Sequence, residues 1–82
     1  MKSKTQDEKF LIALYQAAKE TDDLETPFNR YTIGQSVGLH ERGVNAICKL
    51  LLQANFIKKS SEEEIYITEH GASLVIRLMD EI

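Results

Sequence analysis

The apolar residues change their spacing along the chain, and each change marks a predicted element. From about Thr5 to Lys19 they recur at the spacing of one helical face, among residue types that favour helices. From Thr21 to Tyr31 the sequence is acidic, has no period and contains the only proline. The pattern therefore predicts a first helix over residues 5–19 and a connecting loop after it.

The helical spacing returns after this loop and predicts two helices joined by a short turn. Thr32 is expected to cap a second helix that stops at Gly38, and a third helix is expected from about His40 to Ala54. Asn55 follows, at a position where helices often need a left-handed residue. The inward positions are aliphatic or cysteine: Ile33, Val37, Val44, Ile47, Cys48 and Leu51. Two short helices with a glycine in the turn are typical of a helix-turn-helix.

The last third of the chain predicts a β-hairpin and a final helix. β-Branched and aromatic residues in segments 56–59 and 64–68 flank a polar stretch, as strands do around a turn. Thr68 is expected to cap the last helix, with Glu69 near the positive end of its dipole. The apolar stripe of that helix consists of Leu74, Val75, Leu78, Met79 and Ile82.

The order of these elements is that of a winged helix, and residues 33–57 resemble this superfamily. The stretch reads IGQSVGLHERGVNAICKLLLQANFI, with a small residue after the first aliphatic (Gly34) and aliphatic residues on both sides of the turn glycine (Val37, Gly38, Leu39). The next segments, FIKK, a charged turn and IYITEHG, are similar to the wing and the Thr-x-x-Gly helix entry of small bacterial and archaeal winged-helix regulators. The wing departs from that of DNA-binding members, which is usually basic.

The resemblance implies one winged-helix domain over residues 1–82, an α+β fold that is mostly helical. Its helix-turn-helix spans about 32–54, and a two-stranded hairpin wing spans about 56–68. Proteins of this class commonly regulate transcription by placing the third helix in the major groove of DNA. Because the scaffold serves other roles as well, the residues on that helix decide how well DNA fits.

The composition narrows the class of protein further. The chain has 82 residues, of which 43% are hydrophobic and 28% charged, as expected for one small folded domain. No apolar run approaches the ~20 residues of a membrane helix and the first seven residues are polar, so a cytoplasmic protein without membrane contact is expected. The single cysteine, Cys48, is predicted to face the core and lies far from any ligand spacing with His40 and His70. We therefore expect no enzyme, no catalytic residue, no metal and no cofactor.

The formal net charge of −3 conceals an uneven distribution. Residues 1–27 carry four lysines and six carboxylates, a net charge of −2. Residues 28–59 carry five cations against Glu41 alone, which gives +4. Residues 60–82 carry Arg77 and six carboxylates, which gives −5. A basic helix-turn-helix between acidic ends is compatible with DNA binding despite the negative total.

The outward side of the third helix has the chemistry of a DNA-reading surface. Four polar side chains and no carboxylate lie roughly 100–180° from the inward Val44, at 100° per residue. They are Arg42, Asn45, Lys49 and Gln53. Arginine pairs with guanine, asparagine and glutamine with adenine, and lysine with phosphate or guanine. Double-stranded DNA is therefore the expected partner, although a solvated helix face carries the same residue types.

Phosphate contacts are expected from the segments that flank the third helix. The expected cations are Arg30, Lys58 and Lys59. Possible hydrogen-bond donors at the second helix are Tyr31, Thr32, Gln35 and Ser36, although helix caps look the same without DNA. The wing also carries three consecutive glutamates, Glu62, Glu63 and Glu64. They would be repelled by phosphates, or they would partly neutralise the two wing lysines and leave the third helix to bind alone.

The terminal helices have wider apolar arcs than one buried stripe requires, with Ile12 and Ile76 on the far sides. A homodimer through these helices is expected, which would place two reading helices about one DNA turn apart. Single exposed apolar residues are the simpler alternative.

Two functions stay open on the sequence. The first is a DNA-binding transcriptional regulator, which the basic middle segment favours. The second is a winged helix that contacts a protein partner without binding DNA, which the acidic wing favours.

Overall fold

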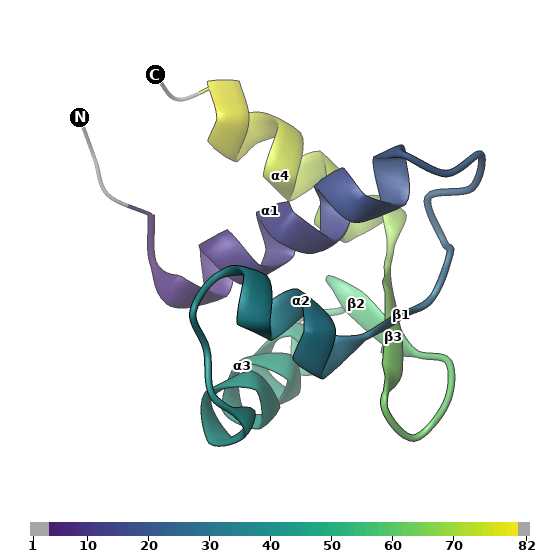
Figure 1. Cartoon of the computed structure of the whole chain (residues 1–82). Helices are drawn as coiled ribbons and strands as arrows, with labels where there is room; N and C mark the ends of the chain where they lie inside the picture. The colour runs from purple at the N-terminus through teal and green to yellow at the C-terminus, as the bar shows by residue number, and fades with distance from the viewer. Residues whose placement is uncertain (1–3, 81–82) are drawn as a thin grey trace.

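The computed structural model describes residues 4–80, which form four helices and one small sheet (Figure 1). In chain order the elements are α1 (Gln6–Lys19), β1 (Phe28–Asn29), α2 (Arg30–Ser36), α3 (Glu41–Gln53), β2 (Ile57–Lys59), β3 (Glu64–Ile67) and α4 (Glu69–Asp80). The expected α+β, mostly helical class is confirmed. Ile82, predicted on the stripe of the last helix, lies outside the described residues. No helix within residues 4–80 has the length and apolar character needed to span a membrane.

Helix α1 forms where its sequence predicts, because its first turn is capped on both sides. The Thr5 hydroxyl accepts a hydrogen bond from the Glu8 backbone N–H at 3.3 Å, and the Glu8 carboxylate accepts one from the Thr5 N–H at 2.9 Å. This capping box satisfies two donors that the helix leaves free. Behind it, Phe10, Leu11 and Leu14 are buried at the centre of the core, where α1 packs against α2, α3, α4 and β3.

Helix α2 begins three residues earlier than the sequence suggested. Thr32 was the expected N-cap, but the cap is Asn29, whose side-chain oxygen accepts hydrogen bonds from the N–H groups of Tyr31 at 2.9 Å and Thr32 at 3.2 Å. Asparagine is among the best N-caps, so the start at Arg30 has a clear local cause.

The turn between α2 and α3, and the end of α3, follow the prediction. Gly38 lies in the left-handed region at φ 78°, which ends α2 and reverses the chain. His40 is the N-cap residue of α3, which ends at Gln53. Asn55 then adopts φ 63°, the left-handed conformation expected after this helix.

The sheet has a third strand that the sequence did not reveal. The hairpin of β2 and β3 is confirmed, but the predicted loop over residues 21–31 contains the short strand β1, which pairs antiparallel with β3. The strand order is β1-β3-β2. On its inner face the sheet buries Ile57, Ile65 and Ile67 against the helices, so the hairpin is anchored at its base while its loop projects away (Figure 1).

Helix α4 closes the core, and Thr68 caps it as predicted. The Thr68 hydroxyl accepts a hydrogen bond from the Gly71 N–H at 3.0 Å and donates to the carbonyl of Asn55 at 2.7 Å. This one residue therefore joins the start of α4 to the end of α3. Val75 is fully buried, and α4 lies along α1.

Candidate nucleic-acid interface

The outward face of α3 is as polar in three dimensions as its sequence suggested. The helix has a buried side made of Val44, Ile47, Cys48 and Leu51. The four predicted reading residues, Arg42, Asn45, Lys49 and Gln53, are all exposed on the other side. Glu41 is the only acid within α3 and lies in the first turn. The structure therefore brings these four side chains together on one surface with no carboxylate between them.

Asn45 is held from α2 by a contact that the sequence did not indicate. The Tyr31 hydroxyl donates a hydrogen bond to Asn45 Oδ1 at 3.0 Å. The sequence predicts Tyr31 only as a donor to phosphate. Because the two residues are 14 positions apart on different helices, no local pattern could have found the pair. The contact joins α2 to the exposed face of α3.

Arg30, the first residue of α2, is not free in solvent. The side chain is partly buried, and its Nε is buried without a hydrogen-bond partner among the described residues. The guanidinium carbon lies 5.2 Å from the centre of the Tyr31 ring, a cation–π distance. Burial raises the pKa of the Cys48 thiol of α3 to about 11, and the charge of Arg30 partly opposes that rise. Arg30 therefore places a positive charge beside the same flank of α3 as Asn45.

The two wing lysines point to opposite sides of the sheet. Lys58 pairs with Tyr66 on the solvent-facing side, whereas Lys59 pairs with Ile65 and shares the side of the buried Ile57. The sequence predicts both lysines as phosphate contacts, and the structure separates them onto the two sides of the sheet.

The wing glutamates have different surroundings, although all three are exposed. Glu63 is attached to the start of α2, because its carbonyl accepts a hydrogen bond from the Arg30 N–H at 2.9 Å and its carboxylate accepts one from Asn29 Nδ2 at 3.4 Å. The carbonyl of Glu64 accepts hydrogen bonds from Ser60 and Ser61, which closes the loop. Only Glu62 has neither kind of contact in the described structure, so the fixed position of the wing depends mainly on Glu63 and Glu64.

The remaining expectations concern the cysteine, metal ligands and the apolar residues of the terminal helices. Cys48 is buried, and no group of three or more histidine, cysteine or acidic side chains within residues 4–80 is placed to hold a metal ion. Ile12 is partly buried and Ile76 is 49% exposed. The homodimer through the terminal helices stays a prediction.

Comparisons of the chain with protein-family models, with curated proteins and with solved structures gave no match. Its function has to be inferred from the chemistry of its own surface.

Proposed function

We propose that this chain is a winged-helix domain that binds double-stranded DNA, with α3 in the major groove, as a transcriptional regulator does. The observation that carries the proposal is the exposed face of α3. It presents one arginine, one asparagine, one lysine and one glutamine and no acid, which is a set that can pair with guanine, adenine and phosphate. Three of the four residues can make bidentate contacts with a base edge, so the face suits readout as well as attraction.

The arrangement of the elements supports the winged-helix assignment. A helical pair with a tight glycine turn is followed by a hairpin, and β1 completes a three-stranded antiparallel sheet in the order β1-β3-β2. The hairpin loop projects away from the helices, as a wing does that approaches the DNA backbone next to the groove (Figure 1).

Positive charge on the same side as α3 supports a phosphate-binding role for its neighbours. Arg30 lies at the start of α2 with its charge near Cys48 of α3, and Lys59 shares the inner side of the sheet with Ile57. Binding would use these cations on phosphates and the α3 side chains on bases. Lys58, on the other side of the sheet, contributes less in this arrangement.

Salt-dependent DNA binding tests the proposal. A fluorescein-labelled mixture of genomic duplex fragments should raise the anisotropy at low salt, and the affinity should fall as salt rises, because bound cations release counterions. The Lys49→Ala variant should lower the slope of log affinity against log salt by about 1. Lys9→Ala, an equally exposed lysine on α1, is the matched control and should leave the slope unchanged.

Two results would contradict the proposal. One is the absence of binding at low salt by protein whose circular dichroism shows the helices intact. The other is an equal change of slope in the Lys49 and Lys9 variants, which would place DNA contact outside α3.

The second candidate function is contact with a protein through the wing, without DNA. The three exposed glutamates at residues 62–64 favour it, since they would oppose phosphates near the wing. Neutralising them separates the two functions: a Glu62→Gln, Glu63→Gln, Glu64→Gln variant should bind DNA more tightly than the wild type if α3 reads DNA. If the wild type and this variant both fail to bind DNA, the protein-contact function is favoured.

A further inference from the structure

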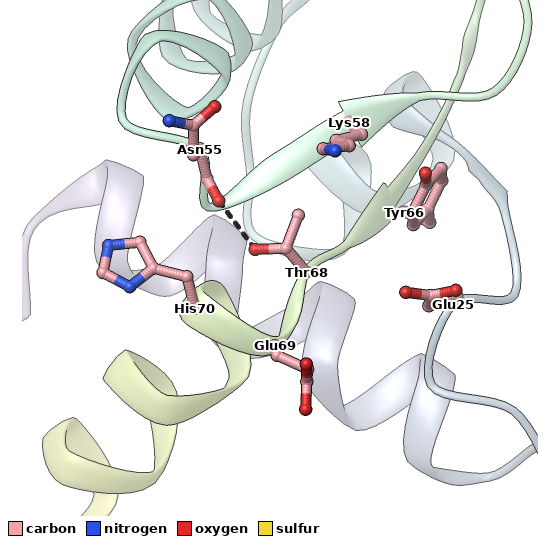
Figure 2. A pocket seen from close by; sticks show the side chains of 7 residues that line it. All are labelled: Glu25, Asn55, Lys58, Tyr66, Thr68, Glu69 and His70. Atoms are coloured by element: carbon pink, nitrogen blue, oxygen red, sulfur yellow. Dashed lines mark hydrogen bonds between the residues drawn. The ribbon is translucent and has the colours of Figure 1, made fainter.

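A groove lies between the hairpin, the loop before β1 and the start of α4, and its larger hollow reaches Asn55, just after the end of α3. It consists of two adjoining hollows of about 590 Å³ and 210 Å³ that share Glu25, Thr68 and Glu69. The larger hollow lies over the solvent-facing side of the hairpin, where Lys58 and Tyr66 form one wall (Figure 2). The loop that carries Glu25 and the helix α3 are at opposite ends of the view in Figure 1.

The smaller hollow is an apolar site that is open to solvent. It is lined by Leu24 from the loop, which is 42% exposed, and by Ile76 from α4, which is 49% exposed. Ala72, one turn before Ile76 on α4, lines it as well. Two large aliphatic side chains that line one hollow can bind an aliphatic side chain of a partner, since burying such a group is favourable.

The middle of the groove is acidic. Glu25 and Glu69 line both hollows, and Figure 2 shows their carboxylates on the same side of the groove. The loop adds three more exposed acids, Glu20, Asp22 and Asp23. An apolar hollow beside paired carboxylates is complementary to a segment in which an aliphatic side chain lies next to a lysine or arginine.

The chain itself displays such a segment on α3. Leu50 is 58% exposed, the most exposed large hydrophobic side chain of the described residues, and it directly follows the exposed Lys49. Leu50 lies roughly 60° beyond Gln53 around the helix, outside the arc of the reading residues. DNA reading therefore leaves Leu50 without a role.

We propose that the groove binds α3 of a second copy of the chain. Leu50 of that copy lies between Leu24 and Ile76, and its Lys49 lies beside the carboxylates of the groove. The groove and the exposed side of α3 are different surfaces of one molecule, so the contact is head-to-tail and differs from a symmetric dimer through the terminal helices. Lys49 also belongs to the proposed DNA surface. DNA and a second copy therefore compete for α3, a consequence that rests on the proposed function.

Sedimentation equilibrium of the full chain without DNA tests the contact. At low salt the average mass should rise above the 9.3 kDa of one chain as the concentration increases, and high salt should return it to one chain. Leu50→Ser and Ile76→Ser should each weaken the association by roughly tenfold, because each removes one side of the apolar contact. Met79→Ser, at a 40% exposed position further along α4, is the matched control and should leave the association unchanged.

A mixture of the two variants distinguishes a head-to-tail contact from a symmetric one. Leu50→Ser keeps an intact groove and Ile76→Ser keeps an intact α3, so an equimolar mixture should form a pair that cannot grow further. Glu25→Lys should abolish the association, and adding Lys49→Glu to the same chain should restore part of it. Glu62→Lys, the control outside the groove, should leave the association unchanged.

Several outcomes would overturn the proposal. One is a wild type that stays a single chain at every concentration at low salt. A second is an association that Ile76→Ser or Met79→Ser abolishes while Leu50→Ser does not, which would indicate a symmetric dimer through α4. A third is the absence of pairing in the mixture. None of these results depends on DNA, so failure of the DNA proposal would be seen separately.

Discussion

The hydroxyl of Tyr31 in α2 donates a hydrogen bond to the side-chain oxygen of Asn45 in α3, over 3.0 Å. With Oδ1 facing Tyr31, the Nδ2 group of Asn45 is directed elsewhere and both its donors are available. An asparagine that reads adenine donates from Nδ2 to N7 and accepts from N6 at Oδ1, which still has a second lone pair. Tyr31 thus fixes the orientation of the amide, which under the proposed function prepares it for a base, and the Arg30 guanidinium lies against the Tyr31 ring.

Replacing Tyr31 by phenylalanine should weaken DNA binding without altering its salt dependence. The variant removes one hydrogen bond to a neutral group, so a loss of about two- to fivefold in affinity is expected. The slope of log affinity against log salt should stay the same, because no phosphate contact is lost. Tyr66→Phe, on the far side of the sheet, serves as the control in the same anisotropy titration. Equal affinities of wild type and Tyr31→Phe would show that this hydrogen bond does not prepare Asn45.

The alternation of side chains along β2 predicts unequal roles for the two wing lysines. Lys59→Ala should lower DNA affinity and reduce the salt slope by about 1, because the side chain lies on the inner side of the sheet, which faces the helices. Lys58→Ala should change both quantities much less, since its side chain lies in the groove with Tyr66 and Glu25. The two variants have the same charge, which makes each the control for the other. An equal reduction of the salt slope in the two variants would mean that both sides of the hairpin contact DNA.

Most of the helical structure could be predicted because its causes are local. The capping box at Thr5, the left-handed Gly38 and Asn55, and the cap at Thr68 each depend on a few neighbouring residues. The outward direction of the reading residues on α3 follows from the helical period alone. These are the features for which sequence and structure agree.

The features that were missed depend on partners far away in the chain. Strand β1 has only two residues, and it exists because Phe28 and Asn29 pair with Ile65 and Glu64 near the other end of the sequence. The cap at Asn29 is local by contrast, since its side chain accepts hydrogen bonds from the N–H groups of Tyr31 and Thr32. The Tyr31–Asn45 contact and the opposite orientations of the wing lysines need the packed arrangement of α2, α3 and the sheet. No periodicity in a single segment contains that information.

The close packing of the two helices of the helix-turn-helix can be tested at Gly34. A β-carbon there would lie 2.2 Å from a methyl group of Val44, which is fully buried and cannot move aside easily. Gly34→Ala should therefore destabilise the fold by roughly 1–3 kcal/mol, the usual cost of overfilling a packed contact. Gly43→Ala is the matched control, because its new methyl would meet its nearest neighbour, Leu39, at an ordinary 3.5 Å. That variant should be neutral or more stable by about 0.5–1 kcal/mol. Urea denaturation of the two variants in parallel measures the difference, and equal stabilities would mean that α2 and α3 can shift apart.

Burial of the Cys48 thiol predicts a specific loss of stability at high pH. Burial raises its pKa from 9.0 to about 11, and the nearby Arg30 opposes this only in part. The folded state therefore holds the thiol proton more tightly than the unfolded chain does. The stability that the protonated Cys48 thiol contributes is complete below pH 9. It is lost as the pH rises from there towards the folded pKa of about 11. Between about pH 8 and 10.5 the wild type should lose roughly 1–2 kcal/mol more of its free energy of unfolding than Cys48→Ala, which lacks the thiol and is otherwise the same chain. Urea denaturation across this range measures both curves. If the free energies of unfolding of the two proteins fall in parallel with pH, the thiol ionises as readily in the folded protein as in the unfolded chain. The inward side of α3 would then be more accessible to solvent than the buried position of Cys48 implies.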